Sequence, residues 1–172
     1  MSRLEAENAA SQLLNKYGID RLPVPVEEIA MWEGAQVVRQ RFEGEQSGFM
    51  YREGRERIIG INTSSGRRRQ RFTIAHEIGH MTLHLQDPLV VDREVNWRDE
   101  NSSLAVDPKE IDANAFAAAL LMPQDLVVRE VRLAAQRSDL SGRDRIISYL
   151  AQIFDVSTSA MSYRLINLGI YS

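Results

Sequence analysis

Every histidine of this chain lies in one short segment, RFTIAHEIGHMTLH, at residues 71–84. The segment contains the pattern His-Glu-x-x-His, formed by His76, Glu77 and His80. Helical spacing places His76 and His80 one turn apart on the same face, from which two imidazoles can bind one metal ion. Glu77 lies about 100° around the helix from His76, so it is free to face a metal-activated water and take its proton. This is the arrangement that zinc peptidases use.

The same pattern also arises by chance, with both histidines on an exposed helix surface. The neighbouring residues oppose that interpretation, because most of them are apolar: Phe72, Ile74, Ala75, Ile78, Met81 and Leu83. A helix this apolar is mostly buried, and two buried imidazoles beside a glutamate need a partner. A metal ion lowers the pKa of a coordinated water towards about 7, so a carboxylate is a sufficient base at neutral pH. The sequence therefore favours a metal site.

A catalytic zinc site uses three protein ligands and leaves one position open. The chain has no cysteine, and His84 lies roughly 12 Å along the helix from His76 and about 80° around it. We interpret His84 as a packing or hydrogen-bonding residue at the helix end, and we expect a carboxylate as the third ligand. The downstream carboxylates are Asp87, Asp92, Glu94, Asp99, Glu100, Asp107, Glu110 and Asp112.

Glu110 is the better candidate among these carboxylates. With Asn114, Ala117 and Leu121 it forms one stripe of a predicted helix, and the small and apolar end of the stripe indicates a buried face. Asp112 falls about 200° away on the same helix. The side-chain oxygen of Asn114 can accept the free N–H of a ligand histidine and fix its tautomer. The alternative is that Glu110 is only an exposed charge in the first turn of a helix.

Composition limits the class of protein. The 172 residues fit one domain, with 44% hydrophobic and 26% charged residues and a net charge of −3. No global positive field attracts the chain to nucleic acid or anionic lipid. The first residues are too charged for a signal peptide, and no apolar run reaches the roughly 18 residues that a membrane span needs. We therefore expect a cytoplasmic protein.

Hydrophobic periodicity predicts a helical chain with a few strands. Strand-like segments cover residues 35–42, 47–53 and 55–62, and the last two form a hairpin about Gly54. Residues 86–107 are polar and acidic and predict a loop. The predicted helices cover about 4–17, 26–34, 68–85, 108–122, 123–136, 143–154 and 157–167.

Two motifs together, RFTIAHEIGHMTLH and EIDANAFAAALLMP, resemble the ImmA/IrrE-type metallopeptidases, which are cytoplasmic bacterial and phage zinc proteases. Weaker similarity extends over PVPVEEIA, SGFMYRE, IIGIN and LAQIFDVSTSAMSYRLINLG. The resemblance implies an α+β, zincin-like fold with a small antiparallel sheet packed on the HExxH helix. Residues 1–122 are then the peptidase core, and residues 123–172 are a C-terminal helical, helix-turn-helix-like subdomain packed on it.

By position, the resemblance assigns one Zn²⁺ per chain to His76, His80 and Glu110, and general acid/base catalysis to Glu77. Asp112 occupies a commonly acidic position of the family motif and remains an alternative ligand. The best-understood members of the family cleave a helix-turn-helix repressor and so switch on its target genes. We therefore expect such a repressor as substrate, with no direct binding to nucleic acid or membrane.

Two further expectations concern substrate contacts. The developing oxyanion of the reaction needs a donor besides the metal, and the candidates are His84, Tyr163 and Arg164. A peptide substrate of a zincin pairs with the edge of a sheet, and by analogy SGFMYR, residues 47–52, is the predicted edge.

Two features indicate other functions. GRRRQR at residues 66–71 is basic, but it begins the HExxH helix of an acidic chain, which favours a solvated helix start or a substrate-facing patch. LAQIFDVSTSAMSYRL has the outline of a DNA-binding helix-turn-helix, yet Arg164 is the only basic residue of its second helix, where phosphate contacts need several. The alternatives are therefore a DNA-binding regulator and a non-proteolytic, partner-binding protein; Glu77 opposes the latter, because a structural metal site needs no base.

Overall fold

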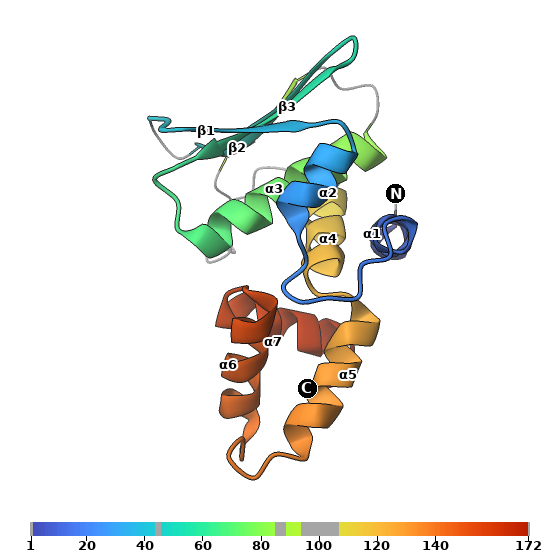
Figure 1. The fold of residues 1–172 in the computed structure, drawn as a ribbon, viewed down its shortest axis with the longest axis vertical. Coiled ribbons are helices and arrows are strands. Elements are labelled where there is room, and N and C mark those ends of the chain that lie inside the picture. Colours follow the sequence, from blue (N-terminus) through green and yellow to red (C-terminus); the bar gives the residue numbers. More distant parts are fainter. Residues whose placement is uncertain (1, 44–45, 85–88, 94–106, 172) are drawn as a thin grey trace.

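The computed structural model describes residues 2–43, 46–84, 89–93 and 107–171 (Figure 1). Seven helices and four strands lie in these ranges. The helices are α1 (Arg3–Lys16), α2 (Val26–Trp32), α3 (Arg67–Leu83), α4 (Pro108–Leu121), α5 (Gln124–Ala135), α6 (Arg143–Phe154) and α7 (Thr158–Asn167), and the strands are β1 (Gln36–Gln40), β2 (Gln46–Glu53), β3 (Glu56–Asn62) and β4 (Leu89–Arg93). The fold is α+β, and each predicted helix and strand is confirmed to within a few residues.

The strands form one sheet in the order β1-β3-β2-β4. The predicted hairpin is confirmed: β2 and β3 pair antiparallel, and Gly54, with φ of +57°, makes the turn between them. The sheet is mixed, not antiparallel as expected, because β1 runs parallel to β3. The hairpin places β3 between β1 and β2. The neighbour of β1 is therefore β3, which runs in the same direction as β1, and not β2, which runs in the opposite direction.

The expectation that SGFMYR forms the sheet edge is wrong. These residues lie in β2, which pairs with β3 on one side and with β4 on the other. The strand that covers β2 falls in the segment 86–107, which the sequence predicts as a loop. LVVDR is a short β-branched run with polar flanks, so its sequence signal is weak. Among the described strands, β1 and β4 are the edges.

The sheet covers α3, and the contact is close (Figure 1). Gly48 of β2 faces this helix. A Cβ at Gly48 would overlap the methyl group of Thr73 and lie 2.7 Å from the carbonyl oxygen of Gly60. Glycine therefore allows the backbone of β2 to approach α3 more closely than any other residue would.

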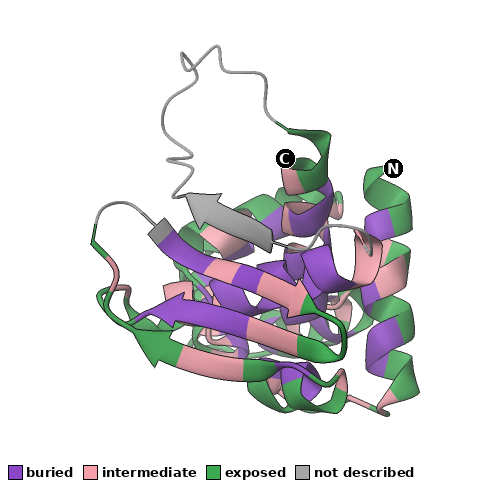
Figure 2. Ribbon diagram, turned by 90° about the horizontal axis from the view of Figure 1, so that it is seen from above, coloured by how far each residue is buried: buried purple, intermediate pink, exposed green. Residues whose placement is uncertain are grey.

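The interior is one continuous apolar cluster. Figure 2 shows buried segments on the strands and on the helices behind them. α4 packs against both α3 and α1, and the cluster continues through α5, α6 and α7. Large buried side chains extend from the sheet to the C-terminal helices, among them Ile59, Ile78, Phe116, Leu150 and Phe154.

The helices α5–α7 lie at the end of the molecule away from the sheet (Figure 1). The expected boundary after residue 122 coincides with the turn between α4 and α5. Charged side chains connect the helices α5–α7 to the rest of the chain. On α7, the buried Arg164 donates through Nε to the carbonyl of Met122 and through Nη1 to Glu7 of α1, both at 3.0 Å. Division into two domains stays a prediction.

No single helix of the described ranges has the length and apolar character to cross a membrane, although α4 and α5, which meet at 47°, pass that test as a bent pair.

Replacing Arg164 by Ala is expected to lower the free energy of unfolding by about 3 kcal/mol. The change removes the donor to the carbonyl of Met122 and one of the two arginine partners of the half-buried Glu7. The matched control is Arg137→Ala, which breaks an exposed pair with Asp139 and should cost at most about 1 kcal/mol. Urea denaturation at neutral pH measures both; equal losses would contradict a buried anchor.

The same pair predicts a dependence on pH. Burial by itself raises the pKa of Glu7, but hydrogen bonds from Arg3 and Arg164 outweigh it and hold the pKa below its ordinary value. Such a carboxylate stabilises the fold above its unfolded-state pKa, and the contribution is lost as the pH falls through the folded-state pKa. The difference in the free energy of unfolding between wild type and Arg164→Ala should therefore become smaller below about pH 4.

Candidate metal centre

The two histidines of the His-Glu-x-x-His pattern face each other on α3. Both side chains are buried, and their Nε2 atoms lie 3.0 Å apart. The ring planes are nearly perpendicular, with centroids 4.6 Å apart. One turn of helix separates the two residues, and this spacing points both ring edges at a single place.

Glu110 reaches the same place from the first turn of α4. Its Oε2 lies 3.1 Å from Nε2 of His76, and its Oε1 lies 3.2 Å from Nε2 of His80. Asp107 caps α4 by accepting from the backbone N–H of Lys109, and this cap helps to define the turn that carries Glu110. The structure therefore brings the three expected ligands together.

Asp112, the alternative ligand, lies on another face of α4. Its carboxyl group is buried, but it is not part of the group formed by His76, His80 and Glu110, whose ligand atoms all lie within 4.8 Å of one another. Helical spacing explains the difference, because two residues along a helix rotate a side chain by about 200°.

The donor atoms of this group fit a metal ion. A tetrahedral ion bound at about 2.0–2.1 Å separates its ligand atoms by about 3.3 Å, close to the three separations found here. Two imidazole nitrogens and a carboxylate oxygen are all electron-pair donors, so their convergence in a buried place favours a cation between them. Three ligands also leave a fourth tetrahedral position for another molecule.

The ring of His76 has a second partner. Its Nδ1 donates to Oδ1 of Asn114 at 3.0 Å, which is the contact expected for that amide. With Nδ1 protonated, the other nitrogen, Nε2, is the atom that can lose its proton and offer a lone pair to a metal ion. The corresponding Nδ1 of His80 is buried and has no hydrogen-bond partner among the described residues, so none of these residues fixes the tautomer of the His80 ring through Nδ1.

The electrostatics favour an ionised Glu110. Burial by itself raises its pKa, but the hydrogen bonds and charge of His76 and His80 outweigh burial and hold the pKa well below its usual range. An ionised carboxylate beside two imidazoles is a suitable ligand set for a divalent cation.

Glu77 is fully buried and lies between α3 and the sheet. A Cβ at Gly48 would lie 3.7 Å from its Oε1, so the carboxylate faces the backbone of β2. This position lies about 100° around α3 from His76, as the sequence predicts. The two candidate ligands of α3, His76 and His80, and Glu77 therefore occupy adjacent faces of the same helix.

His84 lies beside the group and outside it. It is the C-cap residue of α3, and its ring centroid lies 5.5 Å from that of His80. Its Nε2 donates to the carbonyl of Lys109 at 3.3 Å, which ties the end of α3 to the turn that carries Glu110. Burial, followed by the charge of His80, lowers the pKa of His84 and favours the neutral ring.

Tyr163 and Arg164, the other two expected substrate contacts, are not brought to this place. Tyr163 is 61% exposed on α7. Arg164 binds the carbonyl of Met122, at the opposite end of α4 from Glu110, roughly 18 Å along the helix. The sequence places both on a late helix, but only packing decides at which end of α4 that helix lies.

Gly79 is a residue of the site that the sequence reasoning missed. A Cβ there would lie 3.2 Å from the Cα and from the carbonyl oxygen of Ala113, and 3.2 Å from the ring of Phe116. Glycine at this position lets α4 approach α3 closely enough for Glu110 to reach the histidines. The available signal is a glycine in the middle of an apolar helix, where it costs about 1 kcal/mol relative to alanine.

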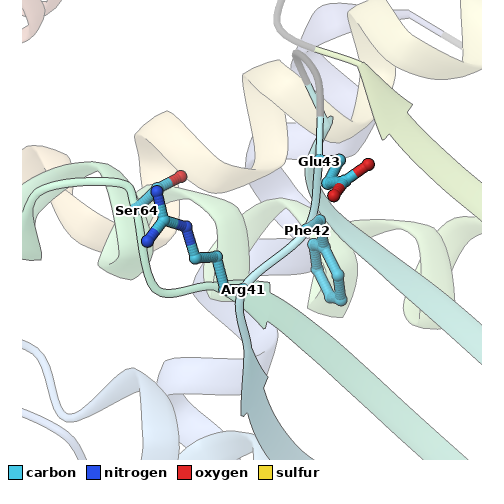
Figure 3. Close-up of a pocket in the computed structure, with 4 residues that line it drawn as sticks. All are labelled: Arg41, Phe42, Glu43 and Ser64. Atoms are coloured by element: carbon cyan, nitrogen blue, oxygen red, sulfur yellow. The ribbon is translucent and has the colours of Figure 1, made fainter.

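A separate pocket of about 520 Å³ is lined by Arg41, Phe42, Glu43 and Ser64. Figure 3 shows the side chain of Arg41 extended toward Ser64. Asn62 organises its rim, because its Oδ1 accepts from the backbone N–H groups of Phe42 and Ser64. This pocket contains none of the expected site residues.

Exchange of each acidic side chain for its amide separates the two candidate ligands. Glu110→Gln is expected to lower the affinity for zinc by at least roughly tenfold to a hundredfold, because the anionic ligand is lost. Asp112→Asn should change it much less, because this carboxyl lies outside the group. Competition with a chromogenic chelator gives both affinities. A large loss in Asp112→Asn alone would reverse the assignment.

Gly79→Ala is expected to weaken zinc binding by roughly 10- to 100-fold, the range typical of groups that orient ligands. The added methyl group must push Ala113, and with it α4, away from α3. The control is Gly66→Ala at the start of the same helix, where a Cβ meets no atom within 4 Å. If thermal unfolding without metal is unchanged and zinc affinity is also unchanged, the close contact does not position Glu110.

Comparison with known proteins places the chain in a metallopeptidase family. The family model Peptidase_M78, described as the IrrE N-terminal-like domain, matches residues 31–166. The chain is 26% identical over 130 residues to Uncharacterized immunity region protein 2 of Bacillus phage phi105, which covers 76% of this chain and 78% of that protein.

Two relatives are named Radiation response metalloprotease IrrE. The one from Deinococcus radiodurans is 34% identical over 108 residues, and the one from Deinococcus deserti is 34% identical over 112 residues; each alignment covers 63% of this chain. The chain spans only 30% and 35% of their respective lengths. The family match covers most of this chain and includes His76, His80 and Glu110. The chain therefore belongs to the Peptidase_M78 family of metallopeptidases with an IrrE N-terminal-like domain.

Proposed function

We propose that this protein is a zinc-dependent endopeptidase of the HExxH type that cleaves a specific protein, a helix-turn-helix repressor, and thereby releases the repressor's target genes. The observation that carries the proposal is the convergence of His76, His80 and Glu110 on one point, with Glu77 buried on the adjacent face of the same helix. A metal site that only stabilises the fold needs its ligands but has no need of a base such as Glu77.

Zinc is the ion that this ligand set suits best. Two histidines and one glutamate are a common ligand set of catalytic zinc, with the fourth position left for water or substrate. When bound, Zn²⁺ polarises the carbonyl of the scissile peptide bond and lowers the pKa of water towards about 7. We propose one ion per chain, held by His76, His80 and Glu110.

Three other residues of the chain then have separate roles in the proposed reaction. Glu77 takes a proton from the attacking water and passes it to the leaving amine. Asn114 holds His76 in the tautomer that leaves Nε2 available. Of the three expected oxyanion donors, we retain His84, because its ring lies beside His80 and because the other two lie elsewhere. To donate to the oxyanion, its Nε2–H must leave the carbonyl of Lys109.

A repressor substrate is supported by the family resemblance and is compatible with the names of the relatives, an immunity region protein and radiation response metalloproteases. Cleavage requires an extended peptide, and zincins bind theirs by adding a strand to a sheet edge. The edge next to β2 is β4 (Leu89–Arg93), so we propose that the substrate pairs with β4. A cytoplasmic location belongs to the same proposal.

A DNA-binding role receives no support from α7. Its basic residue Arg164 is buried and bound to Glu7 and Met122. The exposed large side chains of this helix are Tyr163 and Ile166. A surface of this kind lacks the cations that phosphate contacts require.

Glu77→Gln tests the proposed chemistry. The amide is nearly isosteric with the carboxylate but cannot accept the proton, and loss of a general base typically costs about 10²–10⁴-fold in rate. We expect this variant to retain zinc and to bind the repressor in a pull-down without cutting it on a gel. The substrate in this test is a helix-turn-helix repressor.

The control is Glu28→Gln, an exposed carboxylate paired with Arg21, which should cut at the wild-type rate. Cutting by Glu77→Gln at the wild-type rate would exclude Glu77 as the base. Loss of zinc from Glu77→Gln would show instead that Glu77 supports the metal site.

A further inference from the structure

The arginines at the start of α3 divide into two sets. Arg67, Arg68 and Arg71 converge on the carboxylate of Asp155, at 2.8, 3.6 and 3.4 Å. The side chain of Arg69 does not contact Asp155 and lies near Ser47 and Phe72 instead. Its guanidinium lies over the ring of Phe72, 5.8 Å from the centroid, and its Nη2 lies 3.4 Å from the hydroxyl oxygen of Ser47.

Arg69 and Phe72 continue the face of α3 that carries the metal ligands. The successive sequence separations along Arg69, Phe72, His76 and His80 are 3, 4 and 4, which place all four side chains on one stripe of the helix. The ring of Phe72 lies 6.3 Å from that of His76. Both Arg69 and Phe72 are half-buried. The stripe therefore extends from the metal group to a half-buried cation.

The charge of Arg69 has no acidic partner among the residues that the structure describes, in contrast to its three neighbours. Its Nε is buried and has no hydrogen-bond partner there. Half-buried charges are normally paired, because burial removes part of their hydration. The hydroxyl of Ser47 brings no compensating charge. A guanidinium in this position is suited to a carboxylate, which it can bind through two parallel hydrogen bonds.

We propose that Phe72 and Arg69 form a substrate subsite that selects an acidic side chain two to three residues from the scissile bond, with an apolar side chain between it and the metal. The inference rests on the proposed peptidase function. Arg69 lies seven residues from His76, roughly 10 Å along the helix, and an extended peptide advances about 3.3 Å per residue. The ring of Phe72, between the two, packs against the apolar side chain.

The preference is a property of this stripe and not of the whole protein. The chain has a net charge of −3, so its general field opposes acidic peptides. The other three arginines of the same helix turn are partly neutralised by Asp155. Removal of Arg69 alone should therefore remove the preference, whereas removal of a neighbouring arginine should not.

The test measures binding to the zinc-loaded protein. The probes are short peptide hydroxamates, in which the hydroxamate binds zinc, phenylalanine follows it, and the third residue is Glu or Lys. The hydroxamate is placed at either end of the peptide to cover both chain directions. We expect wild type to bind the Glu probe about tenfold or more tightly than the Lys probe, as for a hydrogen-bonded charge pair.

Two variants and one control make the result specific. Arg69→Gln should bring the ratio of the two dissociation constants close to one, and Arg69→Glu should reverse it. Arg68→Gln removes the same charge from the adjacent residue, whose partner is Asp155, and should keep the wild-type ratio. Zinc content and thermal unfolding of each variant show that the site and the fold are intact.

The outcomes distinguish the subsite from the peptidase. A ratio that is equal in wild type and Arg69→Gln overturns the subsite and leaves the peptidase proposal standing. A preference that depends on Arg69, in a protein that cuts no repressor, supports the subsite and contradicts the proposed substrate. A protein that binds no zinc overturns both proposals.

Discussion

The site depends on the close packing of α4 against α3 at Gly79. Two candidate ligands lie on one helix and are fixed by its pitch. The third candidate lies on another helix, and its reach is set by the distance between the helix axes. The missing side chain at Gly79 allows Ala113 to approach to van der Waals contact. Glu110, three residues before Ala113, then lies within 3.2 Å of both imidazoles. A glycine that costs helix stability is therefore explained by the geometry of the ligands.

The side of α3 that faces the sheet is also closely packed at a glycine. The backbone of β2 passes over the helix at Gly48, and Glu77 is buried in this layer. The candidate metal ligands His76 and His80 thus face Glu110 of α4, and the proposed base faces the sheet. Among the described strands, β4 is the edge next to β2, and β2 lies inside the sheet. A substrate that pairs with β4, as proposed, is therefore one strand further from β3 than the sequence indicates.

Charged residues that resemble a nucleic-acid-binding surface in the sequence serve mostly internal contacts. Three arginines of GRRRQR converge on Asp155, which ends α6 in a left-handed conformation with φ of 52°. Arg164 connects α7 to α1 and to the end of α4. These contacts join the C-terminal helices to the HExxH helix and to the N-terminal helix. Arg69 stands apart from this pattern, and its difference is visible only once the side chains are placed.

The sequence by itself determines all of the described helices, three of the four described strands and the chemistry of the candidate ligands. A helical pitch fixes His76 and His80 on one face, a second periodic stripe favours Glu110 over Asp112, and the positions of Asn114 and Glu77 follow from the same geometry. These are local properties of single helices. The order of the strands, the strand β4, the contact at Gly79 and the positions of Tyr163 and Arg164 are decided only by tertiary structure. They depend on distances between elements far apart in the chain, and periodicity within one element contains no information about those distances.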